Sequence, residues 1–91
     1  MDKNVAFKNR DRLIQLGIAI STIRKMRGLS QEKLAEKANI SRSLISAIEA
    51  PGLAKSFSIE VLFNISDALE VDAADLITAS VLPDKIIKHK K

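Results

Sequence analysis

Residues 28–50 of the chain read GLSQEKLAEKANISRSLISAIEA, and this stretch carries the strongest structural signal in the sequence. It holds two short segments with helical spacing of apolar residues, Gln31–Ala38 and Arg42–Ala50, joined by only three residues. Two helices with so tight a turn must cross steeply, and Ala35 supplies the small side chain needed where they approach. The apolar residues expected on the inner side are Leu34, Ala38, Ile40, Ile45 and Ile48.

One local pattern marks four helix starts: an apolar residue, then Ser or Asp, then a second apolar residue four positions later. The Ser or Asp oxygen can accept from a free N–H of the first turn. The two apolar residues can then contact each other across that turn. The pattern occurs as Leu29-Ser30…Leu34, Ile40-Ser41…Ile45, Phe57-Ser58…Leu62 and Val71-Asp72…Leu76.

The helix stops agree with these starts. Gly28 and Asn39 suit the left-handed conformation that closes a helix, and Pro51-Gly52 ends the segment that Ser41 begins. No segment shows convincing strand alternation, so the chain is predicted to be all-α. The five expected helices are about Asp11–Arg27, Gln31–Ala38, Arg42–Ala50, Ile59–Leu69 and about Ala73–Ala79.

The first expected helix carries more apolar residues than one face needs. Stepping by 100° places Ile14 and Ile18 nearly opposite the main stripe. They are either tolerated surface aliphatics or are covered by Val5 and Phe7 or by a second subunit. The main stripe comprises Leu13, Leu16, Ile20 and Ile23.

Composition excludes several classes of protein. The 91 residues contain no cysteine and one histidine, His89, which excludes disulfide scaffolds, zinc ribbons and His-based metal or catalytic clusters. No stretch approaches the roughly 20 apolar residues that span a bilayer, and residues 1–12 lack the apolar core of a signal peptide. We therefore expect a cytoplasmic protein with no cofactor and no enzymatic activity.

The charge is distributed unevenly along the chain. Residues 1–55 hold 11 Lys and Arg against 5 Asp and Glu, whereas residues 56–84 hold six acids and no base. Four lysines follow in residues 85–91. A basic first half fits a polyanionic partner, and an acidic second half is a poor surface for one.

Segments 28–38, 40–49 and 66–71 closely resemble the Xre-type, lambda-repressor-like helix-turn-helix family, over about residues 16–77. The resemblance implies a compact five-helix bundle that binds operator DNA, usually as a dimer. It divides the chain into a basic N-terminal arm (1–10), a helix-turn-helix DNA-binding domain (11–80) and a basic C-terminal tail (81–91). An ordinary helical hairpin in a small bundle is the alternative for the central motif.

The helix that begins at Arg42 is the expected reader of the DNA major groove. Its outer face carries small side chains that allow close approach, and Arg42 lies at the N-terminal end, where such helices contact bases. We therefore assign base contacts to Arg42, Ser43, Ser46 and Ala47. A contact of Arg42 with phosphate alone, and a merely surface role for the serines, are the alternatives.

Other residues are expected to anchor the phosphate backbone or the scaffold. The family uses a glutamine at the position of Gln31 to face a phosphate. We also assign phosphate contacts to Ser30, Ser41 and Lys55, although the loop 50–57 is longer than in many members and carries only that cation. In the family, residues at the positions of Arg24 and Glu49 form a partly buried ion pair, so we expect a scaffold role for both.

The predicted function is that of a sequence-specific regulator of transcription that binds double-stranded DNA. A homodimer would place two reading helices on a two-fold operator, with the acidic half contributing the subunit interface. Small members of the family include phage-type repressors, mobile-element regulators and controller proteins of restriction–modification systems. The alternative is an antitoxin that binds a partner protein through its tails and autoregulates its own operon.

Overall fold

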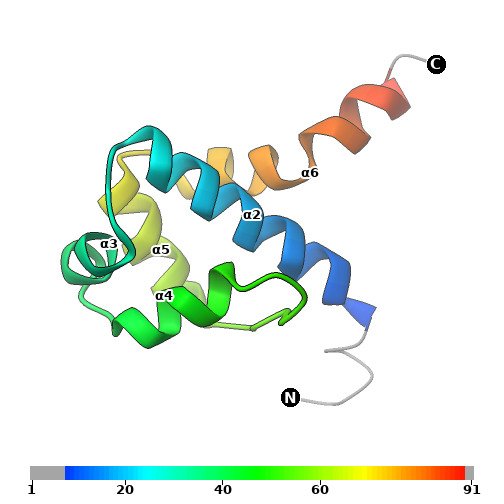
Figure 1. Cartoon of the computed structure of the whole chain (residues 1–91). Coiled ribbons are helices and arrows are strands. Elements are labelled where there is room, and N and C mark those ends of the chain that lie inside the picture. Colours follow the sequence, from blue (N-terminus) through cyan, green and yellow to red (C-terminus); the bar gives the residue numbers. More distant parts are fainter. Residues whose placement is uncertain (1–7, 90–91) are drawn as a thin grey trace.

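The computed structural model describes the backbone of residues 8–89 and the side chains of residues 8–81. Within that range the chain forms five helices and no strand, which confirms the all-α prediction. Val5 and Phe7, proposed to cover Ile14 and Ile18, lie outside the described residues. The helices are α2 (Arg10–Met26), α3 (Gln31–Ala38), α4 (Arg42–Glu49), α5 (Ile59–Leu69) and α6 (Ala73–His89) (Figure 1).

The predicted capping residues begin three of these helices. The hydroxyl oxygen of each serine accepts a hydrogen bond from the backbone N–H three residues later, at 3.0–3.1 Å. These bonds satisfy N–H groups that have no partner within the helix. The pairs are Ser30 with Lys33, Ser41 with Leu44, and Ser58 with Val61.

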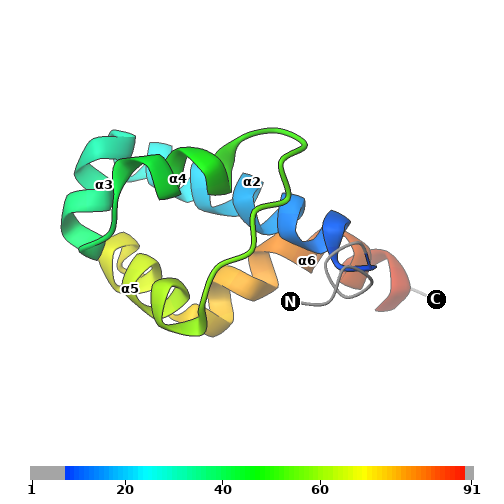
Figure 2. The same cartoon turned by 90° about the horizontal axis from the view of Figure 1, so that it is seen from below.

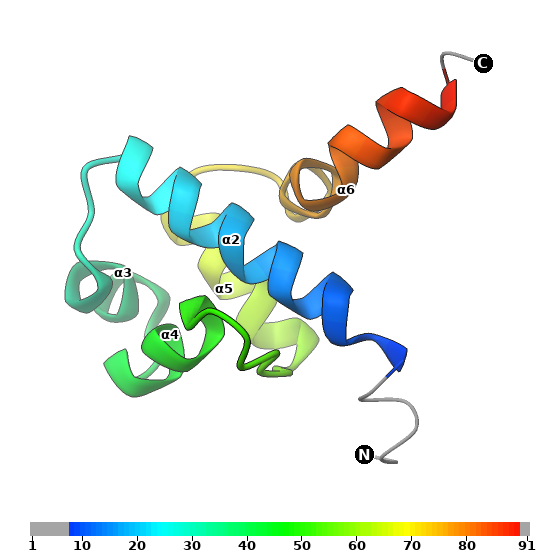
Figure 3. The same cartoon turned by 45° about the vertical axis from the view of Figure 1, so that its right-hand side comes forward.

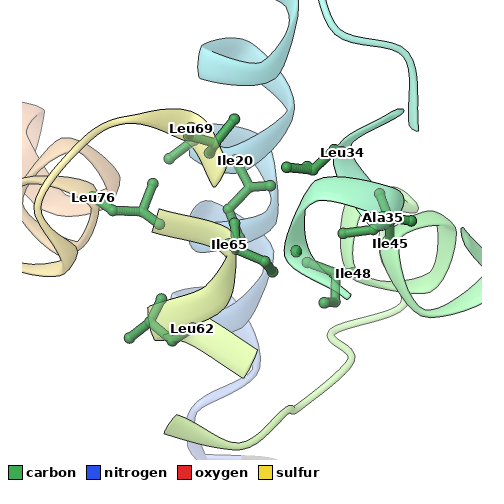
Figure 4. Close-up of a cluster of buried hydrophobic side chains, with 11 residues drawn as sticks. Ile20, Leu34, Ala35, Ile45, Ile48, Leu62, Ile65, Leu69 and Leu76 are labelled. Carbon is green, nitrogen blue, oxygen red and sulfur yellow. The ribbon is translucent and has the colours of Figure 1, made fainter. Parts of the chain in front are cut away.

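The apolar residues of the four start patterns also lie as expected. Leu29, Ile40, Phe57 and Val71, which precede the caps, are partly buried and pack against the main core. Their counterparts one turn into each helix belong to that core, which is drawn in Figure 4. The core comprises Ala19, Ile20, Leu34, Ala35, Ala38, Ile45, Ile48, Leu62, Ile65, Leu69 and Leu76.

The helices pack in a closed ring in the order α2, α4, α3, α5 and α6, with α6 back against α2. Helix α2 packs against α4 and α6, which lie on opposite sides of it, while α3 packs against α4 and α5 (Figures 1 and 3). Gly17 of α2 is buried where α4 crosses, and a Cβ atom there would overlap the carbonyl oxygen of Ile48. Ala35 was predicted as a small residue at a helix crossing, whereas the role of Gly17 was not predicted.

Two predicted helix ends are wrong. Helix α4 ends at Glu49 rather than Ala50, which is extended (φ −65°, ψ 126°) because the proline that follows disfavours the helical conformation. Helix α6 continues to His89, ten residues beyond the expected end. A helix can pass through Pro83 at the cost of one main-chain hydrogen bond, and its last turns project beyond the bundle (Figures 1 and 3).

Among residues 8–89, three non-glycine residues adopt left-handed backbone conformations, and the sequence predicted one of them. Asn39 has φ 58° at the end of α3, as predicted, and Gly28 has φ 73° after α2. Glu70 has φ 60° at the end of α5, and Ala54 has φ 51° in the loop before α5. Glu70 and Ala54 are strained relative to glycine at the same positions.

Arg27 joins the end of α2 to the end of α5. Its Nε donates to the carbonyl oxygen of Leu69 at 2.8 Å, and its Nη2 donates to that of Glu70 at 3.4 Å. These carbonyls have no partner within the helix, and the helix dipole favours a cation there. Arg27, although it is one of the cations of the basic half, therefore stabilises the fold.

Candidate nucleic-acid interface

Helix α4 presents one face to the core and the other to solvent. Ile45 and Ile48 are buried on the inner face, as predicted. Of the residues assigned to base contacts, Arg42, Ser43 and Ser46 are exposed, while Ala47 is half-buried and borders the same surface. The outer face thus consists of small side chains with one cation at its N-terminal end, and α4 lies at the edge of the bundle (Figure 2).

The N-terminus of α4 has its own hydrogen-bond arrangement. Ser41 Oγ accepts from the Leu44 N–H at 3.0 Å and from Ser43 Oγ at 3.3 Å. The hydroxyl hydrogen of Ser41 is still free to donate, because a hydroxyl has one donor in addition to its acceptor sites. Capping and a phosphate contact are therefore compatible at Ser41, and the same holds for Ser30 at the start of α3.

A buried ion pair connects α4 to α2. Arg24 donates through Nε to Glu49 Oε2 at 2.8 Å and through Nη2 to Oε1 at 2.9 Å, with side chains only 10% and 5% exposed. The remaining Nη1 donates to the carbonyl oxygen of Leu29 at 2.7 Å. Such two-pronged pairing fixes both distance and orientation, so α4 is oriented relative to α2 and to the start of α3.

Gln31 belongs to the same network, which the sequence did not reveal. Its Nε2 donates to Glu49 Oε1 at 3.0 Å, so one carboxylate accepts from both α2 and α3. The second hydrogen of the amide is left for another acceptor. The bond to Glu49 orients this amide, which reduces the entropy lost if that hydrogen binds a phosphate.

A shallow groove brings several predicted residues together. Ser30, Gln31 and Glu32 at the N-terminus of α3 line it together with Arg24 and Arg42. The positive end of the α3 dipole and the Arg42 guanidinium both favour an anion there. Lys55 is exposed but does not line this groove or the two others that border α4.

A second groove runs between α2 and α4 and contains a cation that sequence reasoning missed. One face of α2 contributes Ile18, Ser21, Thr22 and Lys25. Ser46 of α4 and Ala50, which directly follows that helix, also line the groove. The side chain of Lys25 is exposed and forms no hydrogen bond or ion pair within residues 8–81. Residues 18, 21, 22 and 25 have helical spacing and therefore share one face of α2. This spacing could have identified the face from the sequence once the opposite face was assigned to the core.

The described residues contain no helix long and apolar enough to cross a membrane. Among the same residues, no group of three or more His, Cys, Asp or Glu side chains could hold a metal ion.

Comparison with solved structures gives several similar chains. The restriction–modification controller protein C.AhdI from Aeromonas hydrophila is 28% identical, with 70% of this chain and 94% of that chain covered and a TM-score of 0.65. The clp gene regulator ClgR from Corynebacterium glutamicum is 25% identical, with 87% and 82% covered and a TM-score of 0.73. The controller C.Esp1396I in a nucleoprotein complex is 31% identical, with 78% and 94% covered and a TM-score of 0.69.

Comparison with curated protein sequences gives no match. The family model described as helix-turn-helix matches residues 20–76, which include α3, α4, α5 and most of the core. The chain therefore belongs to the helix-turn-helix family of DNA-binding transcription regulators, in its Xre-type, lambda-repressor-like form.

Proposed function

We propose that the protein is a transcription regulator that binds a specific double-stranded DNA sequence and reads the major groove with α4. The observation that carries this proposal is the outer face of α4, which is exposed, has small side chains and has Arg42 at its N-terminal end. A helix with such a face fits a groove about 12 Å wide, and an arginine can bond guanine O6 and N7 together. Ser43, Ser46 and Ala47 lie on the same face and complete the base-contacting set.

Phosphate contacts beside α4 would set its register on the duplex. We assign them to Ser30, Gln31 and Ser41, at the N-termini of α3 and α4. We add Lys25, which lines a groove together with Gln31 and Ser46. Lys55 remains a proposed contact from the loop.

We further propose that two copies bind a two-fold operator as a homodimer. Helix α5 exposes Ile59 (61%) and Phe63 (49%) one turn apart, and α6 exposes Ile77 (41%). Residues 56–84 contain no Lys or Arg, so this apolar surface would not compete for DNA. The relatives include two controller proteins of restriction–modification systems, and control of transcription at such an operator is the function we assign here.

Selection of binding sites from a random pool of duplexes tests this function. We expect an enriched sequence with two-fold symmetry and half-sites about one helical turn apart. Arg42→Ala should relax the preference at one position of each half-site and weaken that site by about 1–3 kcal/mol. Arg12→Ala is the matched control, because it removes the same charge from an exposed residue that lines none of the grooves beside α4. An unenriched pool would contradict the proposal.

Sedimentation equilibrium at micromolar concentration tests the homodimer. We expect twice the monomer mass of 10.0 kDa for the parent and the monomer mass for Phe63→Lys. Met26→Lys is the matched control, because Met26 is 76% exposed and lies outside the proposed interface. A parent of 10.0 kDa when free, together with a single copy bound to each duplex of selected DNA, would exclude the homodimer.

A further inference from the structure

An exposed leucine lies beside the proposed reading surface. Leu53, in the loop between α4 and α5, is 54% exposed. It lines an open groove whose remaining walls are the outer face of α4. The residues that line this groove with it are Arg42, Ser43, Ser46, Ala47 and Ala50.

The loop holds Leu53 in a defined position. The Leu53 N–H donates to the carbonyl oxygen of Ala50 at 3.3 Å, and Gly52 between them has φ 78°. Proline followed by a glycine with positive φ is typical of a type II turn. Arg10 Nη2 donates to the carbonyl oxygen of Gly52 at 3.1 Å, so the turn is also bonded to α2. Leu53 therefore stands at a fixed place next to α4.

The residues that line this groove favour contact with an apolar chemical group that belongs to a polyanionic partner. Its walls are three alanine or leucine side chains, two serines and one arginine, with no carboxylate. An apolar side chain gains nothing from a phosphate, whereas the C5 methyl of thymine is the apolar group that the major groove exposes. Contact between this methyl and a leucine removes apolar surface of both from water.

We propose that Leu53 is a specificity-determining residue that contacts a thymine methyl group next to the bases read by α4. This inference rests on the proposed function, since it requires that α4 occupy the major groove. It assigns a role to a loop that carries only one cation, Lys55. The loop would then add sequence preference at the edge of each half-site.

Replacement of thymine by deoxyuridine, which lacks only the methyl group, tests this contact. In the selected operator each thymine is replaced in turn, and the affinities of the parent, Leu53→Ala and Met26→Ala are measured. We expect the parent to lose about three- to tenfold in affinity at one position of each half-site. Leu53→Ala should bind thymine and uracil equally there, whereas Met26→Ala, which removes another exposed apolar side chain, should behave as the parent.

Each other result overturns the inference. If Leu53→Ala bound every operator, with thymine or with uracil, more weakly by the same factor, the leucine would contact the sugar–phosphate backbone. If Leu53→Ala distinguished thymine from uracil as strongly as the parent does, the methyl group would contact another residue, such as Ala47. In both cases the parent still selects a sequence, so the proposed function stands. A parent without any sequence preference would overturn the proposed function and this inference together.

Discussion

Gly17 of α2 lies so close to the carbonyl oxygen of Ile48 in α4 that no side chain fits between the two helices. This contact sets the distance between α2 and the proposed reading helix. Because main chain meets main chain here, neither partner can yield by changing a rotamer.

We expect Gly17→Ala to destabilise the protein by about 1–3 kcal/mol, as overpacking of a core does, although alanine has the higher helix propensity. The displaced α4 should also lower DNA affinity. Denaturant unfolding measures the first effect, and Gln15→Ala, on an exposed position of the same helix, is the control. A Gly17→Ala protein at least as stable as the parent would show that the helices can separate without cost.

The ion pair between Arg24 and Glu49 should contribute strongly to stability. Glu49→Ala leaves the guanidinium of Arg24 buried without its carboxylate, and we expect a loss of about 3 kcal/mol in the free energy of unfolding. The control is Glu36→Ala, which removes the exposed pair with Lys33 (side chains 55% and 69% exposed). That change should cost less than about 1 kcal/mol. Similar losses in the two variants would contradict a structural role for the buried pair.

Lys25 should act on DNA affinity without affecting sequence preference. Loss of one phosphate contact should weaken binding to all duplexes alike and reduce the slope of log affinity against log salt by about 1. Titrations of Lys25→Ala over a salt series measure this slope, and Arg12→Ala again controls for net charge. An unchanged slope would remove Lys25 from the proposed interface.

Glu70→Gly should stabilise the protein. Glu70 occupies the left-handed position that ends α5 with φ 60°, and glycine there avoids the clash of Cβ with the main chain. We expect a gain of about 0.5–1 kcal/mol, measured by thermal unfolding. The matched control, Glu60→Gly within the first turn of the same helix, should instead lose about 1 kcal/mol. Destabilisation of both variants would mean that the Glu70 conformation carries no strain.

The local features of this fold could be predicted because their causes lie within a few residues of each other. Ser30, Ser41 and Ser58 each cap a helix through a backbone N–H only three residues away. Asn39 closes α3 for an equally local reason, its tolerance of a left-handed backbone. The pairing of Arg24 with Glu49, by contrast, was expected only from the resemblance to a family, since no local rule links residues 25 positions apart.

Features that join distant parts of the chain were invisible to such rules. Arg27 was counted only among the cations of residues 1–55, but it bonds the end of α5, 42 residues away. Lys25 lines a groove that exists only after α2 and α4 have packed. Gln31 was expected at a phosphate, and its bond to Glu49 became visible only in the assembled bundle.

The amino-acid sequence was sufficient to predict that the chain is helical, where four helices begin, and which side of the segment after Ser41 is apolar. These properties follow from capping and periodicity, which act over one or two turns. The tertiary structure alone decided which cations face outward, why Gly17 must be a glycine, and that Leu53 borders the surface of α4. These depend on how closely whole helices approach, and that distance is set by all of the side chains and backbone between them at once.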